Sequence, residues 1–317
     1  MTRLKPYWAL ALTALLPALL LSCAGKPFTN TFAPAVGDKR QVQLNTAINI
    51  KMAVMGMNIN QSQSQAMALT LEVTEVDPDG NVMLQATVDD LTADQTMPKL
   101  PGMDLGNAMA DMLKEAKAAL AEAKGEQFSL KVGPAGEIIL SRDLMDLADR
   151  IKRKSKASSG NQMMVNAAID QALDDKVVEE TVGTMFECYR NMATKTGDTW
   201  SVTREVNAGL PMSVTSTYTL GEVTDTNYGV SEAMVITGSG APNLPGMPEG
   251  LPMEMNIDMN GSGTATHAVD RKSTWLTDYR AEFSMTGKMN MSGIPGAGNM
   301  AMDMTLSGTT TIAVTPL

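Results

Sequence analysis

The feature that most constrains this chain is the strict alternation of apolar and polar residues over runs of up to seventeen positions. Three such runs occupy residues 253–269, 275–291 and 300–314. Earlier ones occupy residues 41–54, 67–73 and 82–88, the last two separated by a turn at 77–81. Residues at every second position lie on one face of an extended strand. The sequence therefore predicts long antiparallel strands that bury one face of a sheet.

A change to helical spacing separates two β regions. Residues 104–195 contain three helical patterns and one short hairpin. We expect an α+β protein with a large, curved, half-barrel-like antiparallel β-sheet. Two related β units, residues 37–103 and 196–317, would build the sheet around residues 104–195 as a central helical insert. The relation between the units is read from short echoes in the same order, among them LPGM at 100–103 and again at 244–247.

The first residues have the layout of a bacterial secretory signal. A basic start precedes an apolar run that is too short to span a membrane. Leu-Leu-Ser-Cys at 20–23 resembles the lipobox of bacterial lipoproteins. That resemblance implies that residues 1–22 are a cleaved signal peptide, that Cys23 carries fatty acyl chains such as palmitate, and that residues 23–36 are the lipidated cysteine and its tether. The alternative is an ordinary cleaved signal in which the cysteine has no role.

The lipobox resemblance also implies a location. Ala24 follows the cysteine in place of aspartate, which in such lipoproteins implies sorting to the outer membrane, facing the periplasm. We therefore expect a cell-envelope protein held on a membrane by its N-terminal lipid.

Charge and cysteine content exclude other classes. The formal net charge is −10, without a long basic stripe, which argues against nucleic-acid binding. Only two cysteines are present. With Cys23 committed to lipid, Cys188 has no disulfide partner. Its helical spacing from Met185 and Met192 predicts a buried apolar side chain.

The alternation in the last three runs predicts their register. A hairpin through residues 270–273 that keeps both apolar sets on one face pairs Val269 with Trp275, and therefore Gly261 with Phe283. A second hairpin with Met291 opposite Met300 places Phe283 opposite Gly308, so that the ring covers a glycine on both neighbouring strands. The predicted rows are Met253, Met291 and Met300, followed by Met255, Met289 and Met302.

This methionine-rich face is the candidate site. Its members are Met253, Met255, Met259, Phe283, Met285, Met289, Met291, Met300, Met302 and Met304. Three interpretations stay open: a core packed on the helices with methionine as adaptable filler, a wall for an acyl chain or other apolar ligand, and a thioether site for Cu(I) or Ag(I).

We expect a membrane-anchored, non-enzymatic protein that binds an apolar or lipid-like ligand on this face. The alternatives are soft-metal binding by the same methionines, or a purely structural or partner-binding role in the envelope. No cofactor and no catalytic residue are predicted, because the one histidine, His267, has no nucleophile motif beside it.

The chain also resembles a group of uncharacterised bacterial lipoproteins, filed as a domain of unknown function. The resemblance rests on V-G-D at 36–38, EVDPDGNV at 75–82, GDTW at 197–200 and STWL at 273–276. The family implies no activity. In architecture alone, a curved antiparallel sheet with helices is similar to the Lol-type lipoprotein carriers, which hold acyl chains in a half-barrel. That similarity implies an acyl-chain ligand, although in this chain the helices come in the middle.

Overall fold

The computed structural model describes residues 28–54, 57–96, 106–142, 146–158, 160–173, 175–191, 193–207, 211–241, 254–292 and 300–317. The predicted signal peptide, Cys23 and Met253 lie outside the described residues. Among the described helices, none has the length and apolar character of a membrane-spanning segment.

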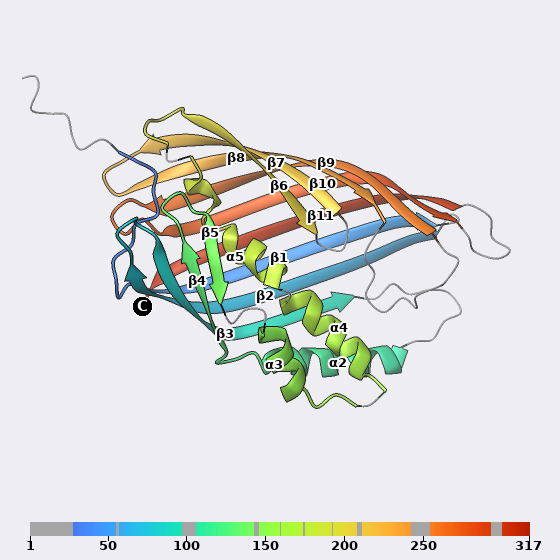
Figure 1. Ribbon diagram of the computed structural model, residues 1–317. Helices are drawn as coiled ribbons and strands as arrows, with labels where there is room; N and C mark the ends of the chain where they lie inside the picture. Colours follow the sequence, from blue (N-terminus) through green and yellow to red (C-terminus); the bar gives the residue numbers. More distant parts are fainter. Residues whose placement is uncertain are drawn as a thin grey trace, which may run out of the picture.

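The described strands form one antiparallel sheet of eleven strands (Figure 1). They are β1 (Lys39–Val54), β2 (Met57–Val76), β3 (Val82–Thr96), β4 (Gln127–Val132), β5 (Ile138–Arg142), β6 (Thr199–Asn207), β7 (Pro211–Val223), β8 (Asn227–Gly240), β9 (Glu254–Asp270), β10 (Leu276–Ser292) and β11 (Met300–Pro316). The order across the sheet is β5-β4-β3-β2-β1-β11-β10-β9-β8-β7-β6.

The first and last strands meet in the middle of this sheet. β1 pairs with β11 along almost its whole length, from Arg40 opposite Pro316 to Ala53 opposite Asp303. The two predicted β units are therefore joined into one continuous surface. β5 and β6 are its edge strands, and the helical part of the chain runs from one edge to the other.

The predicted α+β class is wrong, because the protein is mainly β. Strands account for 60% of the structure and helices for 17%. The helical elements are α2 (Gly106–Ala121), α3 (Leu147–Lys154), α4 (Gln162–Leu173), α5 (Asp175–Gly183) and the 3-10 turn η1 (Glu187–Tyr189). The apolar patterns in this part of the sequence predict three longer helices. Short helices cannot form a layer of their own, so they pack at the β3 and β5 side of the sheet (Figure 1).

The core lies on one face of the sheet, which we call the inner face. It is the face that α2 packs against, and it carries Leu91 of β3, Leu44 of β1, Ile312 of β11 and Tyr279 of β10. These side chains are buried because every second residue of each strand points to this face, while the residues between them are polar and point outward.

The two ends of the sheet differ. One end holds three short turns: 77–81 joins β2 to β3, 224–226 joins β7 to β8, and 271–275 joins β9 to β10. We call this the hairpin end. At the opposite end Met255, Met291 and Met300 sit on three adjacent strands, and we call it the methionine end.

The predicted register between β10 and β11 is confirmed. Phe283 lies opposite Gly308, and Met291 lies opposite Met300. The Phe283 ring covers this glycine so closely that a Cβ atom on Gly308 would lie 2.5 Å from the ring atom Cε1.

The predicted register between β9 and β10 is wrong by two residues. Val269 pairs with Leu276, and the register then shifts between Leu276 and Asp278, so that Phe283 faces Gly263. The reason is a β-bulge next to a longer turn, whose Trp275 packs into the core. An alternating pattern does not reveal a bulge, because the alternation continues on both sides of it.

Candidate functional site

The nine described members of the candidate site all lie on the inner face. The corrected register gives three rows across β9, β10 and β11: Met255, Met291 and Met300 at the tip, then Ile257, Met289 and Met302, then Met259, Gly287 and Met304. Met52 of β1 pairs with Met304 and extends the third row. The methionines therefore come together as predicted, with Met255 in the place that the sequence assigned to Met253.

Burial divides these residues into two groups. Four are core side chains, no more than 7% exposed: Met259, Met285, Met302 and Met304. The other five are half-buried: Met255, Phe283, Met289, Met291 and Met300. Ile50, Met52 and Leu306, which are also half-buried, continue this second group along β1 and β11. The tip row is thus half-buried throughout, while buried and half-buried apolar side chains mix in the rows behind it.

A pocket of about 370 Å³ lies at the methionine end. The tip methionines line it with the polar residues Asn256, Asn290 and Ser292 and with Ala301. Among the residues that the structure describes, no charged side chain lines it. Pockets for small molecules are commonly ~300–1,000 Å³ and mostly apolar, so this pocket has room for part of a chain-like ligand.

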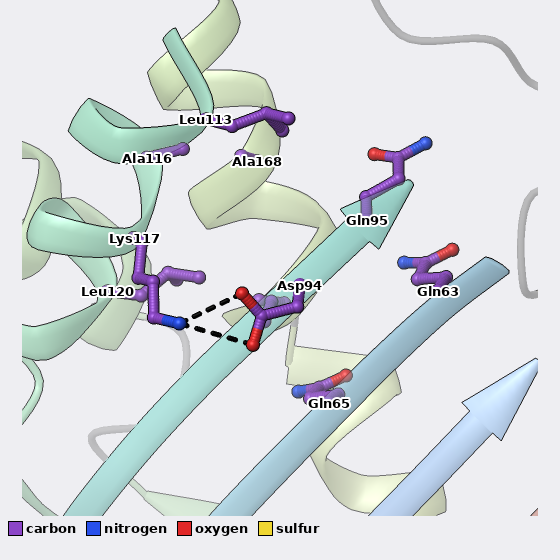
Figure 2. Close-up of a pocket in the computed structure, with 11 residues that line it drawn as sticks. Gln63, Gln65, Asp94, Gln95, Leu113, Ala116, Lys117, Leu120 and Ala168 are labelled. Carbon is purple, nitrogen blue, oxygen red and sulfur yellow. Dashed lines mark hydrogen bonds and ion pairs between the residues drawn. The ribbon is translucent and has the colours of Figure 1, made fainter. Parts of the chain in front are cut away.

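A second, smaller pocket lies between the inner face and α2 and α4 (Figure 2). Its volume is about 70 Å³, enough for a few water molecules. The amides of Gln63, Gln65 and Gln95 border it, and Lys117 of α2 donates to both carboxylate oxygens of Asp94 at 2.8 and 3.2 Å (Figure 2). Its lining mixes these polar groups with alanine and leucine side chains, and its small size does not suit a chain-like ligand.

A buried polar cluster occupies the inner face near the β6 edge of the sheet. Glu232 of β8 and His267 of β9 are 3% and 2% exposed, and the His267 Nε2 atom lies 3.1 Å from a Glu232 carboxylate oxygen. Ser216 of β7 donates its hydroxyl to the other carboxylate oxygen at 2.6 Å. Burial acts to raise the pKa of Glu232, but the hydrogen bonds and the nearby His267 outweigh it and hold that pKa below its ordinary value.

A second carboxylate lies beside the first pair. Glu187 of η1 forms an ion pair with Arg204 of β6, and it accepts the Tyr218 hydroxyl at 3.1 Å. Trp200 stacks on the Tyr218 ring with centroids 5.4 Å apart. Burial, followed by the charge of Glu187, raises the pKa of the Tyr218 hydroxyl, so Tyr218 stays a neutral donor.

The sequence contained a signal for this cluster that our interpretation missed. Glu232 shares the phase of Val230 and Met234, and Arg204 shares the phase of Trp200. A charge at the apolar positions of a strand predicts a buried, paired group.

In the described part of the cluster, Ser216 and His267 both contact Glu232 and do not contact each other. The histidine therefore does not activate this serine as it would a serine nucleophile. Cys188 is buried and free, as predicted, and burial raises the pKa of its thiol, which keeps it uncharged. In the part of the chain that the structure describes, no group of His, Cys, Asp and Glu could hold a metal ion.

Comparison with protein families decides the classification. A model described as "Family of unknown function (DUF6263)" matches residues 79–276, which is more than half of the chain. The chain belongs to this family. The match runs from the turn before β3 to the start of β10, so it includes the buried polar cluster and the beginning of the methionine-rich face.

The comparisons with curated proteins and with solved structures add little to this family assignment. Among curated proteins nothing matches the sequence. A structure entitled "Lipid-protein interactions in lipovitellin" is 10% identical with a TM-score of 0.43, and the match covers 89% of this chain but 25% of lipovitellin. Pseudomonas aeruginosa OccK5 (OpdH) is 6% identical with a TM-score of 0.20, and the match covers 90% of this chain and 100% of that one.

The COG4313 outer membrane channel from Pseudomonas putida F1 is 5% identical with a TM-score of 0.21, over 89% of this chain and 97% of the channel. Of the lipovitellin structure described above, this chain spans about a quarter of the length. Similarity at these levels establishes neither a shared fold nor a shared function.

Proposed function

We propose that this protein is a non-enzymatic, lipid-anchored component of the bacterial cell envelope that binds an apolar, lipid-like ligand on its inner face. The observation that carries the ligand is the division of the methionine face by burial. Its core members are no more than 7% exposed, whereas Met255, Met291 and Met300 line the pocket at the methionine end and remain half-buried, as do Met289 and Phe283 further along β10. Methionine suits such a wall because its unbranched, polarisable side chain adapts to different guests.

The anchor part of the proposal rests on the sequence. The apolar start and Leu-Leu-Ser-Cys at 20–23 support acylation of Cys23, and Ala24 supports an outer-membrane location facing the periplasm. The non-enzymatic part is supported by the arrangement of the buried cluster, in which His267 contacts a carboxylate but no nucleophile.

Removing two thioethers from the accessible part of the face tests the ligand proposal. We expect Met289→Ser combined with Met291→Ser to weaken binding of the fluorescent fatty acid cis-parinaric acid about thirtyfold, because each side chain loses roughly 1 kcal/mol of apolar contact with the guest. The measurement is a fluorescence titration of a soluble form with Cys23→Ser, with the melting temperature of each variant recorded.

The matched control is Met163→Ser with Met164→Ser on α4. These two methionines are 69% and 48% exposed and lie away from the methionine face, so binding should not change. The ligand proposal would be contradicted if Met289→Ser with Met291→Ser bound as tightly as the parent, or if both double variants lost the same affinity.

A second candidate function, soft-metal binding, is favoured by one observation. Met255, Met291 and Met300 are direct cross-strand partners on three adjacent strands and line one pocket. Adjacent strands lie ~4.8 Å apart, so three flexible thioethers can converge on one ion. Thioether sulfur prefers Cu(I) and Ag(I).

Leucine substitution separates the two candidates, because leucine preserves apolar volume and removes sulfur. If the thioethers form a site, calorimetric titration with silver nitrate should show one Ag(I) bound by the parent protein. This binding should be lost when Met255, Met291 and Met300 are all leucine, while cis-parinaric acid still binds. Met163→Leu with Met164→Leu is the control. Silver binding that survives the triple substitution would exclude this site.

A further inference from the structure

The segment that follows the predicted lipid anchor is tied firmly to the hairpin end of the sheet. Asn30 is fully buried, and its backbone N–H donates to the Ala193 carbonyl at 2.9 Å. Its side-chain amide donates to the Cys188 carbonyl at 2.5 Å and accepts the Tyr228 hydroxyl at 2.6 Å. Both polar groups of this amide are therefore satisfied inside the protein.

Two residues further on, Phe32 occupies the centre of an aromatic cluster. It is 0% exposed, and its ring centroid lies 4.9 Å from that of Phe186, 5.1 Å from Trp275 and 5.7 Å from Tyr189. Its backbone N–H donates to the Pro134 carbonyl at 2.9 Å. Asn30 and Phe32, which the sequence assigned to a tether, thus form part of the core.

The first described residue lies at the outermost part of this end. The Phe28 ring meets Tyr228 of β8 edge-on at 4.9 Å, and the Arg271 guanidinium lies 5.5 Å from its centroid. Both partners adjoin the turns at 224–226 and 271–275. In Figure 1 the N-terminal strand accordingly begins at the same end as the C-terminus.

The chain between the anchor and this fixed point is short. Four residues, Ala24 to Pro27, separate Cys23 from Phe28, so even a fully extended chain reaches only about 18 Å. β9 has 17 residues, and at ~3.3 Å per residue it is about 55 Å long. The hairpin end can therefore reach the anchoring bilayer, whereas an upright sheet holds the methionine end far from it.

Charge favours the upright orientation over one in which the sheet lies flat. The formal net charge is −10, and the outward face of the long strands carries charges of both signs, with Lys288 opposite Asp258 and Asp303. Broad contact of a chain with this net charge gains no attraction from a bilayer with anionic headgroups.

We propose that the hairpin end of the sheet rests on the bilayer that holds the acyl chains of Cys23, and that the methionine end points away from it. This inference rests on the lipid anchor proposed above. A ligand at the methionine end would then exchange with the aqueous compartment or with a partner there, and not directly with the anchoring membrane.

Energy transfer from single labels to the membrane tests this orientation. The full-length lipidated protein is reconstituted on phosphatidylethanolamine–phosphatidylglycerol vesicles whose headgroups carry an acceptor dye. A donor is attached at Thr226→Cys at the hairpin end, or at Asn290→Cys near the methionine end. Both positions are exposed, and the native Cys188 is fully buried. We expect severalfold higher transfer efficiency from position 226 than from position 290.

A tether variant provides the matched control. Inserting a flexible Gly-Ser segment of about 20 residues between Pro27 and Phe28 lengthens the reach, so transfer from position 226 should fall toward that from position 290. Equal transfer from the two labels with the native tether, or stronger transfer from position 290, would overturn the orientation.

A further control separates this inference from the anchor on which it rests. The Cys23→Ser protein should not bind the vesicles and should lack the acyl mass of the parent. If the parent itself carries no acyl mass, the anchor and the orientation both fail. If the parent is acylated and vesicle-bound but its labels show no difference, the orientation alone fails.

Discussion

Replacing Glu232 with leucine is expected to lower the free energy of unfolding by about 3–5 kcal/mol, because it removes the partner of a buried group and leaves others unpaired. His267 would lose the carboxylate 3.1 Å from its Nε2 atom, and the Ser216 hydroxyl would lose the acceptor of its 2.6 Å hydrogen bond. Chemical denaturation of the soluble Cys23→Ser form measures the change.

The double variant Glu232→Leu with His267→Leu is the control for this prediction. Replacing both members of a buried pair with apolar groups removes the unpaired histidine, so much of the loss should be recovered. Losses that simply add in the double variant would show that the two side chains do not act as a pair.

The same pair predicts how stability depends on pH. The pKa of Glu232 is lower in the folded protein than its ordinary value of 4.5, so the folded state binds this proton more weakly than the unfolded state does. Its stabilising contribution is therefore present above 4.5 and is lost as the pH falls through the lowered pKa. Glu232→Leu should make the acid-induced loss of stability smaller.

Truncating Phe32 to alanine is expected to have a comparably large effect, about 3–5 kcal/mol. The ring is fully buried and contacts three other aromatic rings, so its removal leaves a cavity that the surrounding strands cannot close. The change is measured by chemical denaturation.

Phe28→Ala is the comparison, because Phe28 is only half-buried and should cost clearly less. A Phe32→Ala effect as small as that of Phe28→Ala would mean that residues 28–36 are not held against the sheet. The short-tether argument for membrane orientation would then lose its basis.

The register shows how far alternation can be used to predict a sheet. The pairing of Phe283 with Gly308 was predicted correctly because a ring and a glycine complement each other in volume across two strands. The pairing of Phe283 with Gly261 was wrong because the turn before Leu276 and the bulge between Leu276 and Asp278 each shift the register by one residue. A shift of two preserves which face each residue occupies, so the methionines still share one face although their partners changed.

The prediction of an α+β fold was wrong for a different reason. The helical spacing in residues 104–195 does correspond to helices, but these helices are short and cover only part of the inner face. The joining of β1 with β11 was not predictable from either β unit, since it pairs strands more than 250 residues apart. This pairing joins the two β regions into one sheet.

The amino-acid sequence by itself determined which residues form strands, which face of each strand is apolar and that the methionines lie together, because these properties depend on neighbours one or two positions away. Only the tertiary structure decided that Asn30 and Phe32 are buried at the hairpin end, that Glu232 meets His267, and which methionines remain accessible. Those outcomes depend on contacts between segments far apart in the chain, where burial and pairing are settled by the packing of the whole sheet.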